Sequence, residues 1–219
     1  MGSLPFTAEE FISLFETYNT SIWPMQIVAY VLGGLAVFLA IRRTPASGRL
    51  IGAILAFFWL WMGIVYNLVF FTEINRAAYG FGSMFVAQGI LFLGACVWKD
   101  RINYKVSPDI YSFTGAIFIL YAMVIYPILG SAFGHGYPRC PAFGITPCPT
   151  TIFTFGILLF AARKVPWYLF VIPLVWSLIG SQAAVSLTIR EDLALPVVGI
   201  FGTVMIVLKN RMLKRKPIL

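Results

Sequence analysis

Seven long apolar segments follow one another along this chain of 219 residues, and basic residues are concentrated in every second gap between them. Hydrophobic residues make up 60% of the chain and charged residues 11%, a far more apolar composition than that of soluble domains. A helix needs about 20 apolar residues to cross about 30 Å of hydrocarbon. The sequence therefore predicts an all-α, seven-helix transmembrane bundle, with spans over residues 23–41, 50–71, 77–98, 110–133, 146–162, 167–189 and 193–208.

The basic residues also predict the orientation of the bundle. Of the 16 lysines and arginines, only Arg76, Arg139 and Arg190 lie outside one alternating set of loops and the C-terminus. Loops rich in lysine and arginine stay in the cytoplasm, so we expect the N-terminus outside and the C-terminus in the cytoplasm. The spans leave no soluble domain over, and residues 1–219 are predicted to form a single transmembrane domain.

The net charge of +8 raises the question of which partners the chain has. The basic residues flank apolar spans, where orientation and lipid explain them, so we expect no nucleic acid as a partner. The run from Lys209 to Lys216 is predicted to bind anionic lipid headgroups at the surface of the bilayer.

Cofactors and enzymatic chemistry find little support in the spans. The last span has no lysine for a retinal Schiff base, and His135 is the only histidine, too few for bis-histidine haem. No H-E-x-x-H motif is present. We expect no cofactor and favour a role other than catalysis.

A short helix is predicted before the first span, over residues 6–18. Thr7 and Glu10 have the spacing of a capping box, and Phe6 and Phe11 that of a hydrophobic staple. The helix has an apolar and a polar side, as in helices that lie in a membrane interface. It serves either as an anchor, which the sequence favours, or as a lid. The N-terminus lacks a basic n-region, so we expect no cleaved signal peptide.

The fifth span is short, because Pro147 and Pro149 disfavour helix before themselves and place its start at or after Pro149. The preceding loop must then dip inward, which is tolerated only inside protein or around a watery cavity. The helix start would face a polar or anionic group. We therefore predict an outward-facing polar pocket, lined by Asn67, Gln88, Tyr126, Thr150, Thr151 and Gln182, with Glu73 and His135 at its mouth. The alternative is that these groups only form hydrogen bonds between helices.

Two cysteines, Cys140 and Cys148, share the loop that precedes the fifth span. On the outer side of a bacterial inner membrane they would form a disulfide. The alternative is a soft-metal site made by His135, Cys140 and Cys148, a weak pattern because the spacing is irregular.

Two segments, Gly134 to Pro138 and Pro147 to Gly156, together with the pattern of spans resemble a bacterial multi-pass membrane family known only as a domain of unknown function. The resemblance implies an inner-membrane location and adds no catalytic residue. The leading hypothesis is a protein that binds, or lets pass, a small polar or anionic solute. The alternatives are a sensor or assembly partner that uses the outer loop 134–149, without transport, and an intramembrane enzyme or metal handler built on the histidine and the two loop cysteines.

Overall fold

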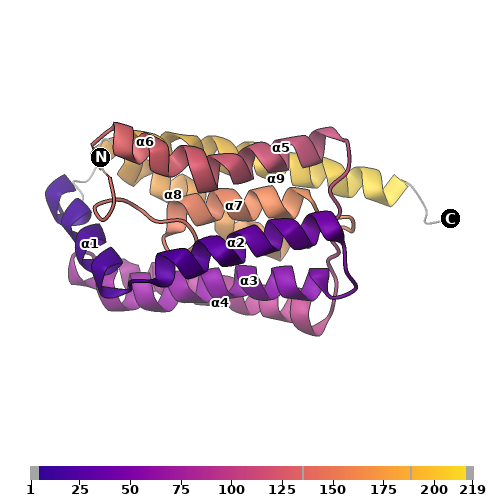
Figure 1. The fold of residues 1–219 in the computed structure, drawn as a ribbon, viewed down its shortest axis with the longest axis horizontal. Coiled ribbons are helices and arrows are strands. Elements are labelled where there is room, and N and C mark those ends of the chain that lie inside the picture. The colour runs from indigo at the N-terminus through magenta and orange to yellow at the C-terminus, as the bar shows by residue number, and fades with distance from the viewer. Residues whose placement is uncertain (1–4, 135, 188, 216–219) are drawn as a thin grey trace.

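The computed structural model is a bundle whose long helices run along one axis (Figure 1). It describes residues 5–134, 136–187 and 189–215. In this part of the chain there is no β-strand beyond an isolated bridge between Tyr104 and Ala161. The predicted all-α fold is confirmed. The α-helices are α1 (Ala8–Ser21), α2 (Met25–Arg42), α3 (Ser47–Trp61), α4 (Ala78–Phe92), α5 (Ile110–Leu120), α6 (Tyr126–Ala132), α7 (Pro147–Leu159), α8 (Val171–Leu187) and α9 (Ala194–Arg215).

Shorter helical turns extend or join these helices. Three are π-helical and lengthen the helix before them: η1 (Met62–Phe70), η3 (Leu93–Trp98) and η4 (Tyr121–Ile125). Three are 3₁₀ turns: η2 (Phe71–Glu73), η5 (Trp167–Leu169) and η6 (Arg190–Leu193). π-helical turns are rare and often occur at functional sites.

The surface of the bundle is apolar, as expected for a protein in lipid. Among the described residues, five helical segments are long and apolar enough to cross a membrane: Met25–Arg42, Ser47–Glu73, Ala78–Trp98, Ile110–Ala132 and Arg190–Lys214. Pro147–Leu159 and Trp167–Gln182 are shorter apolar helices. Large apolar side chains lie exposed along α2, α5 and α9, which water would not tolerate over so large a patch. These features indicate a membrane protein.

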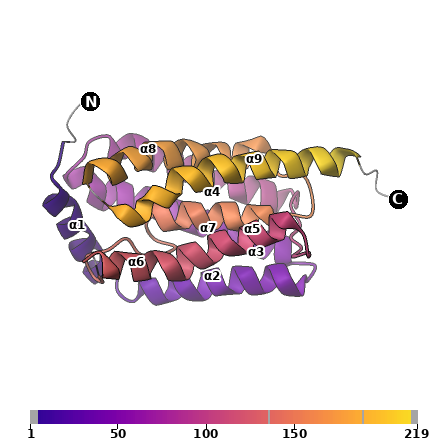
Figure 2. The same cartoon turned by 90° about the horizontal axis from the view of Figure 1, so that it is seen from above.

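Helix α7 is the centre of the bundle, packed by α5, α8 and α9 and touched by α2 (Figures 1 and 2). Its 13 residues are buried except for the half-buried Cys148. The preceding loop enters the bundle with Phe143 and Ile145 buried, as the shortness of this segment predicted. The helix begins at Pro147, earlier than the expected start at Pro149, because proline is tolerated in the first turn of a helix.

The far end of α7 is closed by polar contacts. Lys209 of α9 donates its ammonium to the carbonyl of Leu159 at 2.7 Å, in the position of a C-terminal cap. The chain after α7 then pairs with an extended loop, through a bond of 2.8 Å from the Lys105 amide to the Phe160 carbonyl. This irregular pairing takes the place of the helix that the sequence predicted up to residue 162.

Helix α1 lies across one end of the bundle, here called the α1 end (Figures 1 and 2). Its apolar side, including Phe11 and Phe15, is buried against protein. The Tyr18 hydroxyl donates to the Ile145 carbonyl at 2.7 Å and accepts from the Trp61 indole at 2.9 Å. The apolar side of α1 thus packs against the bundle, and the anchor and the lid both stay predictions.

The predicted capping box of α1 is present, and it makes the helix start sensitive to acid. The Thr7 amide and hydroxyl donate to the Glu10 carboxylate at 2.7 and 2.9 Å, which holds the pKa of Glu10 below its usual 4.5. A lowered pKa stabilises the folded form at higher pH and loses this contribution as the pH falls through the folded value.

We therefore expect the amides of α1 to lose protection from hydrogen exchange below about pH 4.5, after correction for the intrinsic rate. A Glu10→Gln variant should lack this step, because its amide does not titrate. Equal pH dependence in the two proteins would contradict the prediction.

Candidate functional site

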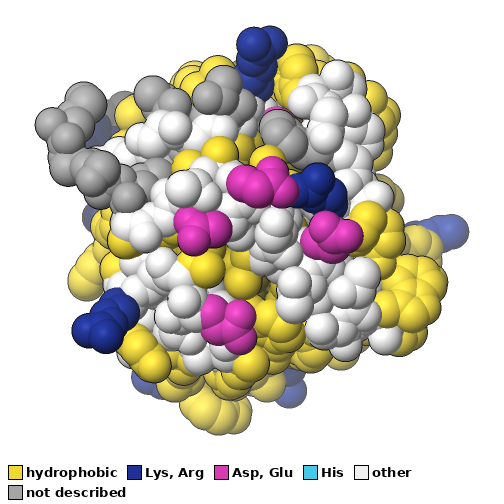
Figure 3. Space-filling view, turned by 90° about the vertical axis from the view of Figure 1, so that its left-hand side faces the viewer, with side chains coloured by type: hydrophobic (Ala, Val, Ile, Leu, Met, Phe, Trp, Pro, Cys, Tyr) yellow, Lys and Arg dark blue, Asp and Glu magenta, His cyan; other side chains and the backbone are white. Residues whose placement is uncertain are grey.

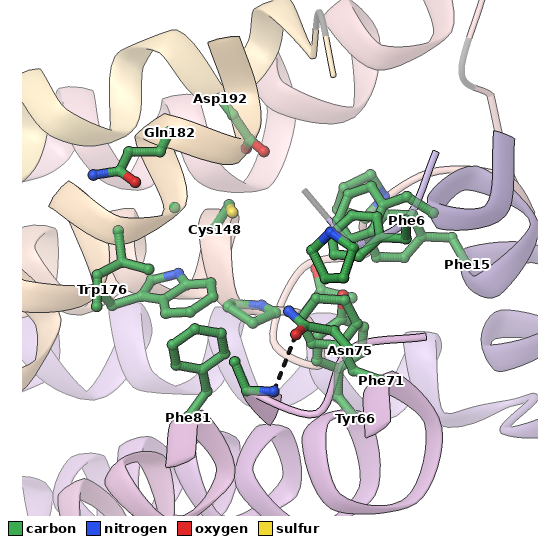
Figure 4. A pocket seen from close by; sticks show the side chains of 18 residues that line it. Phe6, Phe15, Tyr66, Phe71, Asn75, Phe81, Cys148, Trp176, Gln182 and Asp192 are labelled. Carbon is green, nitrogen blue, oxygen red and sulfur yellow. Dashed lines mark hydrogen bonds between the residues drawn. The ribbon is translucent and has the colours of Figure 1, made fainter. Parts of the chain in front are cut away.

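A cavity of about 260 Å³ lies at the α1 end, between α1, η1, α4, α7, α8 and η6 (Figure 4). The volume is below the range of about 300–1,000 Å³ of drug-sized sites, so it suits a small molecule. Aromatic rings supply most of the wall, and a few polar side chains supply the rest. The aromatic lining residues are Phe6, Phe11, Phe15, Tyr66, Phe71, Phe81 and Trp176, and the polar ones are Asn75, Thr146, Cys148, Gln182 and Asp192.

The aromatic wall is built where α1 meets η1 and η2. Phe15 and Phe71 both stack on the ring of Tyr66, with centroids 6.0 and 5.6 Å away. Phe6 packs edge-on against Phe71 at 5.7 Å. Because Phe6 and Phe15 come from the segment that lies across the bundle end, α1 closes one side of the cavity.

The polar wall is built by α7, α8 and η6, and its centre is Asp192. Figure 4 shows Asp192, Cys148 and Gln182 on one side of the cavity, away from Phe6 and Phe15. The Asp192 side chain is only 4% exposed, and one carboxylate oxygen accepts a hydrogen bond of 2.5 Å from the Tyr126 hydroxyl. No described lysine or arginine forms an ion pair with it. A buried carboxylate without a cationic partner is costly when ionised.

The indole of Trp176 adds a donor without an acceptor. Its ring is 6% exposed, and among the described residues its N–H has no hydrogen-bond partner. The Cys148 thiol lies beside both this indole and the Asp192 carboxylate, but sulfur is a weak acceptor. Buried donors without partners are rare. The cavity therefore offers a carboxylate, an indole N–H without a partner and the Gln182 amide on its polar side, and an aromatic surface on the other.

The residues that the sequence predicted to line a pocket are mostly elsewhere. Gln182 lines the cavity. Tyr126 lies behind the wall and holds Asp192, and Glu73 is exposed at the same end of the bundle. Gln88 is buried and donates to the Leu169 carbonyl at 3.0 Å, which joins α4 to η5. His135 is outside the described residues.

The remaining predicted residues are buried within the bundle. The Asn67 amide donates to the Met62 carbonyl at 2.8 Å, inside η1. The Thr150 hydroxyl donates to the Thr146 carbonyl at 2.7 Å, and Thr151 is 1% exposed. Asn67 and Thr150 thus donate hydrogen bonds within their own helices, and the bond of Gln88 fits the alternative in which polar groups join helices. The side-chain oxygens of Asn67 and Gln88 have no partner among the described residues.

Sequence reasoning missed Asp192, Trp176 and the aromatic wall, and it considered Cys148 only as a disulfide or metal-site candidate. The acidic pair Glu191 and Asp192 follows the sixth apolar segment and reads as part of a loop in water. In the structure η6 folds both carboxylates inward, to 0% and 4% exposure. The sequence did contain one indication: Glu191 and Asp192 lie directly beside an apolar span, and acidic residues at membrane depth are unusual unless they have a function.

Both loop cysteines, Cys140 and Cys148, are free thiols in the structure. Burial, together with the nearby charge of Glu191, raises the pKa of Cys140 to about 11, so it is a protonated thiol at neutral pH. No group of three metal-binding side chains occurs in the described ranges, which leave out His135. The disulfide and the metal site stay predictions.

Thiol titration of protein unfolded without reductant distinguishes free cysteines from a disulfide between Cys140 and Cys148. The structure predicts three reactive thiols per chain, and the disulfide predicts one. Unfolding with reductant serves as the control and should give three in either case.

Fold and cavity together define a helical membrane protein with a small aromatic cavity and a buried carboxylate. The chain belongs to DUF6064, a family of unknown function whose model matches residues 8–216. This agrees with the resemblance to a family without an assigned activity. No curated protein and no solved structure matches the chain.

Proposed function

We propose that the protein spans a bacterial inner membrane seven times, with its N-terminus outside, and binds a small organic cation from the outer side. The observation that carries the binding proposal is the carboxylate of Asp192, buried in the wall of an aromatic cavity with no described lysine or arginine paired to it. A cation with an apolar body would satisfy both parts of this wall.

The distribution of charge supports the proposed orientation. The α1 end carries exposed acidic side chains, and Figure 3 looks onto this end and shows their carboxylates. At the opposite end the exposed charges are mainly basic. By the positive-inside rule the basic end is cytoplasmic. The acidic residues are Glu9, Glu10, Glu16 and Glu73, and the basic ones include Lys99, Arg101, Arg163, Lys164, Arg211 and Lys214.

The count of seven spans is supported by how the short helix α7 is placed. Helix α7 has 13 residues, a rise of about 20 Å, which is less than the hydrocarbon thickness of about 30 Å. It does not meet lipid, however, because the bundle surrounds it. Irregular backbone at its two ends is buried in protein, which is where such backbone is tolerated in membranes.

Cysteine labelling in intact cells tests the orientation. In a background in which the three native cysteines are alanine, Thr20→Cys on α1 should react with a membrane-impermeant maleimide. Lys99→Cys, which is also exposed, should react only after the membrane is opened. The reverse pattern would overturn the orientation.

The sequence suggested a small polar or anionic solute, and the lining favours a cation instead. Aromatic faces attract cations through their quadrupoles, and no described lysine or arginine lines the cavity. The start of α7 is also a poor anion site, because Pro147 and Pro149 have no N–H to donate. The free indole N–H of Trp176 would suit an oxygen acceptor on the same ligand.

Binding is the step that the geometry supports, rather than passage through the bundle. The interior is filled by large buried side chains, among them Trp59, Phe85 and Phe153. The competing role as a sensor or assembly partner with the outer loop as contact surface has less support, because Cys140, Phe143 and Ile145 of that loop are buried.

Calorimetry on the purified protein tests the ligand class with three probes of similar size. Benzyltrimethylammonium should bind, neutral benzyl alcohol should bind more weakly, and phenylacetate should bind least. An affinity for phenylacetate equal to or above that for the cation would overturn the proposal, as would the absence of binding by all three.

A further inference from the structure

A second hollow lies at the end of the bundle opposite α1. Basic side chains line it, whereas the aromatic cavity has an acidic side chain in its wall. The second hollow has a volume of about 610 Å³ and lies between the loop after η3, the loop after α7 and the last turns of α9. Within the part of the chain that the structure describes, no acidic residue lines it. Five basic side chains do: Arg101, Arg163, Lys164, Arg211 and Lys214.

Hydrogen bonds hold the three segments of this basic hollow together. The side chain of Asn210 on α9 accepts from the Val165 amide at 2.9 Å and donates to the Val165 carbonyl at 2.8 Å, which fastens the loop after α7 to α9. The Arg101 guanidinium donates to the Tyr168 hydroxyl at 3.3 Å. The hollow is thus part of the folded bundle rather than a chance meeting of free side chains.

The basic side chains have no acidic partners among the described residues. The described ion pair at this end of the bundle joins Arg49 to Asp100, and those at the α1 end join Arg139 to Glu9 and Glu16. Like charges held close together repel one another unless an anion lies between them. A group with more than one negative charge is therefore the expected occupant.

The rim of the hollow points to a lipid as the source of that anion. Trp167 is 68% exposed at its edge, and tryptophan is enriched at the level of lipid headgroups. Phe170 and Val207 form its apolar floor. Basic pockets between membrane helices bind the headgroups of anionic lipids. Val204 and Leu208 of α9, which lie within a helical turn of the lining residue Val207 along the chain, are exposed and would contact acyl chains.

We propose that this hollow is a specific site for an anionic phospholipid with two phosphodiester groups, a cardiolipin-type headgroup. The two phosphates would lie against the arginines and lysines, and the acyl chains along α9. The site is separate from the aromatic cavity and does not depend on what that cavity binds. The sequence predicted that the whole run from Lys209 to Lys216 binds anionic lipid. The proposed site uses only Arg211 and Lys214 of that run, together with basic residues of two loops.

Native mass spectrometry of the full chain in detergent, titrated with cardiolipin and with phosphatidylcholine, tests the site. The variant Arg163→Gln/Arg211→Gln should bind cardiolipin at least about tenfold more weakly than the natural protein. The matched control is Arg42→Gln/Arg43→Gln, which removes two charges at the same end but outside the hollow. It should stay within about twofold of the natural protein.

Three outcomes would overturn the proposal. One is an equal loss of binding in both double variants, since that would indicate a general effect of charge. Another is unchanged binding in Arg163→Gln/Arg211→Gln. The third is full competition by millimolar inorganic phosphate, because the hollow would then bind free phosphate rather than lipid. All four replaced side chains are exposed, so thermal unfolding should confirm that both variants fold.

Discussion

Replacing Asp192 with asparagine is expected to weaken binding of benzyltrimethylammonium by about 100-fold. Removing one partner of a buried ion pair costs about 3 kcal/mol, which is about 100-fold in affinity. Asparagine has nearly the same shape and keeps a carbonyl oxygen to accept from Tyr126, so the wall itself should persist. Calorimetry with the cation and with benzyl alcohol measures the effect, and the affinity for the neutral probe should change little.

The matched control is Glu73→Gln, because Glu73 is exposed at the same end of the bundle and does not line the cavity. Its charge is screened by water and salt, and cation affinity should stay within about twofold. If the two variants lose the same amount of affinity, the cation is attracted by the combined negative charge of the α1 end, and Asp192 does not contact it. If Asp192→Asn binds the cation as well as the natural protein, the proposed site is wrong.

Replacing Gly156 with alanine is expected to lower stability by about 1–3 kcal/mol, the usual cost of an overpacked contact. Helices α5 and α7 approach closely where Gly115 faces Gly156. A β-carbon at position 156 would lie 2.8 Å from the Gly115 carbonyl oxygen and 2.7 Å from a side-chain carbon of Ile119. Because the first of these atoms belongs to the backbone, one of the two helices must shift.

Thermal unfolding in detergent measures this loss. The control is Gly34→Ala on the exposed surface of α2, where a β-carbon would meet no atom within 4 Å. This change should leave the unfolding temperature the same or raise it, since alanine is the better helix former. Equal effects of the two substitutions would show that the α5–α7 contact does not limit packing.

The helices themselves could be predicted closely from the sequence. The expected span over residues 110–133 corresponds to the segment Ile110–Ala132, and that over 77–98 to Ala78–Trp98. Hydropathy is a local property, and a helix in lipid must satisfy its own backbone, so twenty apolar residues leave few alternatives. The capping box of Thr7 and Glu10 was equally predictable, because its partners are three residues apart.

The site could not be predicted in the same way. The sequence prediction took its pocket residues from the polar side chains in or near the expected spans. It included Gln182 but left Asp192 in the loop between the sixth and seventh spans. The burial of Asp192 depends on η6 turning inward and on Tyr126, a partner 66 residues away in the chain. The role of α1 was also open, since an amphipathic helix suits lipid and protein equally well until its contacts, such as that of Tyr18 with Ile145, are known.

The sequence by itself determined an all-helical bundle with apolar outer faces and opposite charges at its two ends, because hydropathy and charge are read from short stretches of chain. The tertiary structure alone decided which side chains meet. It joined Asp192, Cys148 and Trp176 from three separate elements into one wall, and it placed the aromatic rings of α1 opposite. Contacts of this kind depend on packing between segments that are distant in the chain, and short sequence patterns carry no information about that packing.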